Sequence, residues 1–173
     1  MKKLIVLMAP PCVGKTLIAN QIKETHKNCK IISKTDVLKY HPDEHINSTT
    51  IRELYYFKIN EAFSYYDIVI ADDTQTTIEA RQELFNHIKN LNDIEIIGIW
   101  IEIPLQSALS YNKTRSSDEY LDPYIIKEIY RYAVSPRQNE PFKNVIFISR
   151  ENCIGLQTNK PRIQSISELI KDI

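Results

Sequence analysis

The sequence contains only three glycines among its 173 residues, so a glycine that falls inside a motif carries weight. Its three cysteines, Cys12, Cys29 and Cys153, are odd in number and include no Cys-x-x-Cys pair. That pattern indicates neither a disulfide framework nor a zinc site. A net charge is absent as well, because 22 basic side chains balance 22 acidic ones. The chain as a whole therefore has no electrostatic attraction to nucleic acid or to an anionic membrane.

Long hydrophobic runs are missing too. The longest apolar run near the start, residues 4–12, is too short to span a bilayer and contains two prolines. It also lacks the small-residue cleavage site of a signal peptide. We therefore expect a cytoplasmic protein that has no membrane partner.

The composition does provide enough apolar material for one folded domain. Hydrophobic residues make up 43% of the chain and charged residues 25%, which is typical of a globular protein. Bases outnumber acids in residues 1–60, and acids outnumber bases in residues 61–130. The first segment could line a local basic groove, although ordinary solvated faces explain the same distribution.

Five short runs rich in Ile and Val alternate with segments of helical periodicity. The expected strands are residues 4–8, 30–33, 67–71, 94–101 and 144–149. The expected helices are residues 14–27, 47–66, 78–91, 122–134 and 165–173. Near-continuous apolar runs are typical of strands that are buried on both faces. The alternation predicts a single α/β domain over residues 1–173, with a five-stranded parallel sheet and helices on both faces.

The first expected strand leads directly into a phosphate-binding motif. Residues 9–16 read Ala-Pro-Pro-Cys-Val-Gly-Lys-Thr and precede an expected helix, so the motif lies on a strand-to-helix turn. Backbone N–H groups at such a turn form a cradle for anions. Lys15 can neutralise the β- and γ-phosphates of a nucleotide, and the Thr16 hydroxyl can bind Mg²⁺. Gly14 lets the backbone approach the phosphates closely.

Two positions depart from the usual motif. Ala9 stands where the first glycine is usual, and Cys12 also replaces a glycine. We interpret Cys12 as a small residue that fills this place. The alternative is a reactive thiol beside the phosphates.

Acidic residues that follow the second and third expected strands are candidates for the chemistry. In an open α/β sheet the ligand crevice lies beyond the carboxyl ends of the strands. Asp36 follows the second strand and can accept a proton from an attacking hydroxyl, or it can cap a helix. Asp72 and Asp73 follow the third strand and can hold Mg²⁺ or its water shell, with helix capping as the alternative.

The segment after the fourth expected strand is predicted to form a lid over residues 111–121. Lys113 and Arg115 can bring positive charge to a phosphate in transfer, and the segment can exclude water. An exposed basic loop without a ligand explains these two residues as well.

Together these motifs resemble the P-loop kinases of the bacteriophage polynucleotide 5′-kinase type and their zeta-toxin-like relatives. The resemblance covers roughly residues 2–149 and consists of segments in the family's order. They are the phosphate loop at 11–16, residues 34–39, residues 73–75 with Arg81, the lid with Arg115, and Glu140-Pro141-Phe142 before the last strand.

The resemblance implies transfer of the γ-phosphate of ATP, with Mg²⁺ as cofactor, to a hydroxyl acceptor. The catalytic residues would be Lys15, Asp36 as general base, and Arg115. The ATP-binding residues would be Pro11, Cys12, Val13, Gly14, Lys15, Thr16 and Arg115, with Thr16 as metal ligand. The acceptor-binding residues would be Lys39, Asp73, Thr74, Gln75 and Arg81. Lys39 stands where the family has Arg, and Gln75 where it has Asn.

The first candidate for the acceptor is the 5′-OH end of a polynucleotide, in a bacterial or phage-infected host. The second candidate function is a small-molecule kinase of the same fold that acts on a nucleoside, sugar nucleotide or antibiotic. The third is a nucleotide-binding module that has lost catalysis. The chain contains no segment of the phosphatase type that accompanies some polynucleotide kinases.

Overall fold

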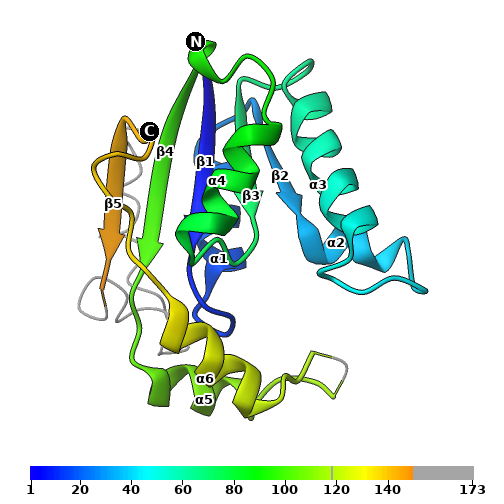
Figure 1. The fold of residues 1–173 in the computed structure, drawn as a ribbon, viewed down its shortest axis with the longest axis vertical. Helices are drawn as coiled ribbons and strands as arrows, with labels where there is room; N and C mark the ends of the chain where they lie inside the picture. The colour runs from blue at the N-terminus through cyan, green and yellow to red at the C-terminus, as the bar shows by residue number, and fades with distance from the viewer. Residues whose placement is uncertain (118, 150–173) are drawn as a thin grey trace.

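The computed structural model, drawn in Figure 1, describes residues 1–117 and 119–149. Five strands form one parallel sheet: β1 (Lys2–Met8), β2 (Cys29–Ser33), β3 (Ile68–Asp72), β4 (Ile94–Ile101) and β5 (Asn144–Ile148). Their order across the sheet is β2-β3-β1-β4-β5. The prediction of a five-stranded parallel sheet is confirmed, and each strand lies at or close to its expected position.

Helices connect these strands. They are α1 (Lys15–Thr25), α2 (Lys34–Lys39), α3 (Thr49–Ala62), α4 (Ile78–His87), the 3₁₀ turn η1 (Leu91–Asp93), α5 (Leu105–Asn112) and α6 (Pro123–Tyr132). The expected helix at residues 165–173 lies outside the described residues. No helix in the described part of the chain is long and apolar enough to cross a membrane.

The sheet separates two hydrophobic cores. On one face it packs against α1, α5 and α6, and on the other face against α2, α3 and α4. β1 contributes to both cores in alternation, with Ile5 and Leu7 on the first face and Leu4 and Val6 on the second. Because both faces of β1 are buried, this strand reads as an uninterrupted apolar run in the sequence. The prediction of helices on both faces is confirmed.

The strand register brings the polar ends of three strands together. Leu7 of β1 pairs with Asp72 of β3, which in turn pairs with Ser33 of β2. The loop after β1, the start of α2 and the segment after β3 therefore meet at one edge of the sheet. Figure 1 shows that α5 and α6 also lie beyond the ends of the strands at this edge.

Candidate active site

The phosphate loop, residues 9–16, leaves β1 at the centre of the sheet and enters α1. Gly14 caps α1 in the left-handed conformation, with φ of 89°. Cys12 is left-handed as well, with φ of 64°. A Cβ disfavours this conformation. This explains why glycine is the usual residue at the place in the motif that Cys12 occupies. The Ala9 amide donates to the Thr74 carbonyl over 3.0 Å, and this bond ties the loop to the segment after β3.

Lys15 lies inside this loop. Its Nζ donates to the carbonyl oxygens of Ala9 and Pro10, both at 3.1 Å. Burial lowers the pKa of Lys15, and the neighbouring carboxylates of Asp72 and Asp73 oppose that shift. The loop's own carbonyls thus hold the ammonium group in place, and phosphate oxygens are the natural replacement for them. Val13 is buried in the core, so its contribution to phosphate binding would come from its backbone.

Thr16 and Asp72 form the oxygen-rich side of the site. Asp72 ends β3 and is 7% exposed, and its carboxyl lies close to the Thr16 hydroxyl. Burial raises the pKa of Asp72, Lys15 opposes the shift, and the charges of Asp73 and Asp36 add to it.

These two side chains fit a magnesium ion. Mg²⁺ prefers oxygen ligands, and it usually takes one or two from the protein and the rest from waters and substrate phosphates. Within residues 1–117 and 119–149, no group of three or more His, Cys, Asp or Glu side chains could hold a metal by itself. A hydroxyl and a carboxylate beside a phosphate cradle are the donor set that a nucleotide-bound Mg²⁺ requires.

The capping alternatives for the acidic residues are wrong. Thr77 is the N-cap of α4, and its side chain accepts a hydrogen bond from the Ala80 amide at 3.2 Å. Asp72 and Asp73 therefore do not cap that helix. The N-cap position of α2 is Ser33, so Asp36 lies within the first turn instead.

Asp36 stands on α2 with its side chain 63% exposed. It forms an ion pair with Lys39 at 3.0 Å, and the hydrogen bond to Asp36 raises the pKa of Lys39. Asp36 is also close enough to Asp72 to raise the pKa of that carboxyl. An accessible carboxylate therefore faces solvent beside the phosphate loop, and Lys39 is directly adjacent to it.

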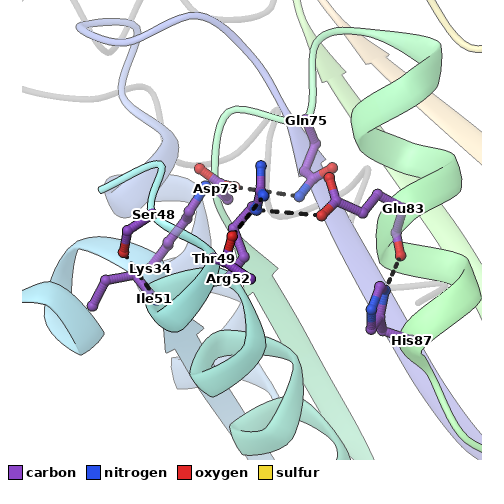
Figure 2. Close-up of polar contacts among 9 residues, drawn as sticks. All are labelled: Lys34, Ser48, Thr49, Ile51, Arg52, Asp73, Gln75, Glu83 and His87. Carbon is purple, nitrogen blue, oxygen red and sulfur yellow. Dashed lines mark hydrogen bonds and ion pairs between the residues drawn. The ribbon is translucent and has the colours of Figure 1, made fainter. Parts of the chain in front are cut away.

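Figure 2 shows how Asp73 is held at the end of β3. Its carboxylate accepts hydrogen bonds from Lys34 Nζ at 3.2 Å and from Gln75 Nε2 at 3.4 Å. Nearby, Arg52 of α3 pairs with Glu83 of α4 at 3.4 Å. Sequence alone does not distinguish Lys34 and Arg52 as site residues, because both are cations on helices whose neighbours only the fold reveals.

Arg81 does not lie where an acceptor-binding residue is expected. Its side chain is fully buried, and its Nη2 donates to Glu140 Oε1 at 2.8 Å. Its Nη1 donates to the carbonyls of Gln75 and Val134 at 3.2 and 3.0 Å. Because these donors are engaged inside the protein, Arg81 stabilises the segment after β3 through the Gln75 carbonyl. The expectation that Arg81 contacts the acceptor directly is therefore corrected: it supports that segment from within the protein.

Arg115 reaches the phosphate loop from the lid segment. Its Nη1 donates to Cys12 Sγ over 3.2 Å, and its Nε pairs with Glu119 at 3.7 Å. Lys113, by contrast, is exposed. The arginine expected to act on a transferred phosphate thus lies against the loop that would bind the nucleotide. Asp118, inside the lid segment, lies outside the described residues.

A family model for the chromatin associated protein KTI12 matches residues 2–154. The chain belongs to the KTI12 family. No curated protein is a significant match to it. The solved structure of Chaetomium thermophilum Kti12 in complex with ADP-AlF3 is similar to this chain, with a TM-score of 0.73 at 16% identity. That match covers 98% of this chain and 96% of the other.

Other solved structures extend the likeness beyond the KTI12 family. A fungal RNA kinase has a TM-score of 0.61 at 16% identity, over 99% of this chain and 95% of its own. The Mycobacterium tuberculosis APS kinase CysC, in complex with AMPPNP and APS, has a TM-score of 0.62 at 10% identity, over 98% of each chain. Identities this low show the fold alone. The P-loop kinase fold is confirmed, and the bacteriophage polynucleotide kinase type is not.

Proposed function

We propose that this KTI12-family chain binds Mg²⁺-ATP at residues 9–16 and transfers the γ-phosphate to a hydroxyl, first of all the 5′-OH end of a polynucleotide. One observation carries the proposal. Lys15, the Thr16–Asp72 pair, Asp36 and Arg115 come from four separate segments and gather at one edge of the sheet. Such convergence matches what phosphoryl transfer requires: positioning and charge stabilisation around one group.

On the donor side, backbone N–H groups of the loop and the start of α1 would hold the phosphates. Lys15 would exchange its bonds to the Ala9 and Pro10 carbonyls for bonds to phosphate oxygens. Thr16 and Asp72 would hold the magnesium ion, which when bound neutralises charge that develops on the β- and γ-phosphates. Arg115 would add positive charge from the lid side.

On the acceptor side, Asp36 would take the proton from the attacking hydroxyl. Its side chain is 63% exposed, which leaves it open to a substrate hydroxyl. Lys39 would then turn to the acceptor, because an exposed ion pair is weak and opens easily. Asp73 and Thr74, in the neighbouring segment after β3, would position the acceptor. Gln75 is only 3% exposed, so the expectation that it contacts the acceptor is corrected: it would act through its hydrogen bond to Asp73.

The likeness to a fungal RNA kinase supports a polynucleotide acceptor. Figure 2 shows that two cations near the expected acceptor residues are each paired with a carboxylate, Lys34 with Asp73 and Arg52 with Glu83. Lys34 is buried, whereas the Arg52 side chain is 37% exposed and would be the one of the two that a phosphate of a polynucleotide end reaches.

A second candidate function is hydrolysis, in which water takes the place of the acceptor hydroxyl. The likeness to a Kti12 bound to ADP-AlF3 favours it, as does the open position of Asp36, which water can reach. The same donor-side residues would serve both reactions. The two candidates therefore differ only in what occupies the space beside Asp36.

The decisive experiment follows the labelled γ-phosphate of ATP in a panel of acceptors: 5′-OH DNA, 5′-OH RNA, nucleosides, small alcohols and water. A labelled oligonucleotide supports the polynucleotide kinase, and inorganic phosphate alone supports hydrolysis. Label in a small molecule moves the function to the small-molecule class. Nucleotide binding without turnover on any acceptor contradicts both candidates and indicates a binding module.

Two variants test whether turnover in this panel depends on Lys15. Lys15→Ala should abolish turnover, because no other cation lies inside the loop itself. Lys23→Ala is the matched control, since Lys23 is an exposed lysine in the last turn of the same helix. Loss of turnover in both variants would point to an unstable α1 and not to a role of Lys15 in the chemistry.

A further inference from the structure

Asn112, the last residue of α5, is only 1% exposed, and its side-chain amide spans the lid segment. Its Nδ2 donates to the Leu121 carbonyl at 2.6 Å, and its Oδ1 accepts from the Leu121 amide at 3.0 Å. One side chain thus joins the two ends of the segment that carries Arg115.

The same amide also reaches the phosphate loop. The Cys12 thiol donates to Asn112 Oδ1 over 3.6 Å, and Cys12 Sγ accepts from Arg115 Nη1 over 3.2 Å. A continuous series of contacts therefore runs from Leu121 through Asn112 and Cys12 to Arg115. It connects the base of the lid segment, the phosphate loop and the lid arginine.

The chemistry of the position is specific for asparagine. The Leu121 backbone requires both a donor and an acceptor on one planar group, which an amide supplies and a carboxylate does not. An aspartate would place a second acceptor against the Leu121 carbonyl. An alanine would leave two backbone groups and the Cys12 thiol without their bonds, at a site almost closed to solvent.

We propose that Asn112 is a positioning residue: it fixes the lid segment so that Arg115 lies over the phosphate loop. The proposal rests on the proposed function, because it assumes that Arg115 acts on the transferred phosphate. Asn112 itself would touch neither nucleotide nor acceptor. It would act through Arg115, with Cys12 as the link between the two side chains.

The test compares binding of ADP with binding of ADP plus aluminium fluoride in the full chain, by calorimetry with Mg²⁺. Aluminium fluoride stands in for a phosphate in transfer, so its extra affinity reports on Arg115 without any acceptor. Asn112→Ala should weaken binding of ADP-aluminium fluoride at least about tenfold, since one misplaced donor has effects of that size or larger. Affinity for ADP alone should stay within about twofold.

Arg115→Ala should produce the same pattern, and the Asn112→Ala/Arg115→Ala double variant should be no worse than Arg115→Ala. Non-additivity is the signature of residues that act through one another. Asn86→Ala, at an exposed asparagine of α4, is the matched control and should change neither affinity. Additive losses, or an equal loss of ADP and ADP-aluminium fluoride affinity, would overturn the proposal, and so would unchanged affinity in folded Asn112→Ala.

A second measurement covers the case in which Asn112→Ala does not fold. In the wild-type chain the Leu121 amide should exchange its hydrogen at least about tenfold more slowly than an unprotected amide, because Asn112 holds it. Exchange at the unprotected rate would refute the contact. If the acceptor panel shows no turnover while these binding and exchange results hold, the proposed reaction fails and the assignment of Asn112 stands.

Discussion

The proposed role of Asp36 as general base can be tested separately from nucleotide binding. It stands on α2 and is exposed, whereas the phosphates would lie in the loop after β1. Asp36→Asn should lower kcat about 10²- to 10⁴-fold, the usual contribution of a general base. KM for ATP should hardly change. Steady-state kinetics with the best acceptor of the panel measures both.

The control for this variant is Asp43→Asn, which changes an exposed aspartate in the turn after α2. It should leave kcat unaltered. An Asp36→Asn enzyme with wild-type kcat would show that the base is assigned wrongly, while the assignment of Lys15 would be untouched.

Asp72 should give nucleotide binding a characteristic dependence on pH. Burial raises the pKa of this carboxyl against the opposing charge of Lys15. The protonated form cannot hold Mg²⁺ together with Thr16. Magnesium-dependent ATP affinity should therefore fall, on acidification, at a higher pH than the value of about 3.9 for an ordinary aspartate suggests.

The measurement is a titration of ATP affinity, with and without Mg²⁺, from about pH 7 downwards to about pH 4. Asp72→Asn should abolish the difference that Mg²⁺ makes over this range. An unchanged magnesium-dependent profile in Asp72→Asn would assign the metal to other ligands.

At the scale of single elements, the N-cap of α4 is a defined source of stability. The Thr77 side chain accepts a hydrogen bond from the Ala80 amide, and α4 carries Arg81 behind the site. Thr77→Ala should lower the free energy of unfolding by about 1 kcal/mol. Thr77→Ser keeps the hydroxyl and should restore most of it, as denaturant titration would show. Equal losses in both variants would argue against the cap.

The central strands β1, β3 and β4 could be predicted from the sequence because they are continuous apolar runs that are mostly buried. The edge strands β2 and β5 are partly exposed, and their Ile and Val residues mark them. Helix α5 could not be predicted, because it has eight residues and only Ala108 and Asn112 are buried. Eight residues are too few for a helical periodicity to be recognised among the polar residues around them. The structure assigns it to Leu105–Asn112, directly before the lid arginine.

The candidate site was predictable where a local motif marks it, as for Lys15 and Thr16. It was not predictable where a residue acts through distant partners. Arg81 and Glu140 are 59 residues apart in the chain, and Asn112 reaches Cys12 across 100 residues. No local spacing distinguishes such residues from an exposed arginine or asparagine.

At the scale of the whole molecule, the buried Arg81–Glu140 pair joins α4 to the segment before β5. Glu140 also accepts from the Arg137 amide at 2.8 Å. Glu140→Gln should lower the free energy of unfolding by about 3–5 kcal/mol, because it leaves the Arg81 charge buried and uncompensated. Glu128→Gln, which breaks the exposed pair with Arg131, is the control and should have little effect.

The same pair predicts an acid limb of stability. Burial raises the pKa of Glu140, but the hydrogen bonds from Arg81 and the Arg137 amide outweigh it and hold the pKa below its usual value. Its stabilising contribution is therefore complete above the ordinary glutamate value of about 4.3 and is lost as pH falls through the lower pKa of the folded state. Thermal melts below about pH 4.3 should show a shallower pH dependence in Glu140→Gln than in the wild type.

The strand order has a consequence for the time at which the protein can first bind a nucleotide during its own synthesis. β1 leaves the ribosome before the other strands of this sheet, yet it pairs with β3 and β4. Its two neighbours are complete only after residues 72 and 101 have been made. Pairing between such distant segments forms late. The phosphate loop, encoded near the start of the chain, should thus be among the later parts of the nascent protein to become competent.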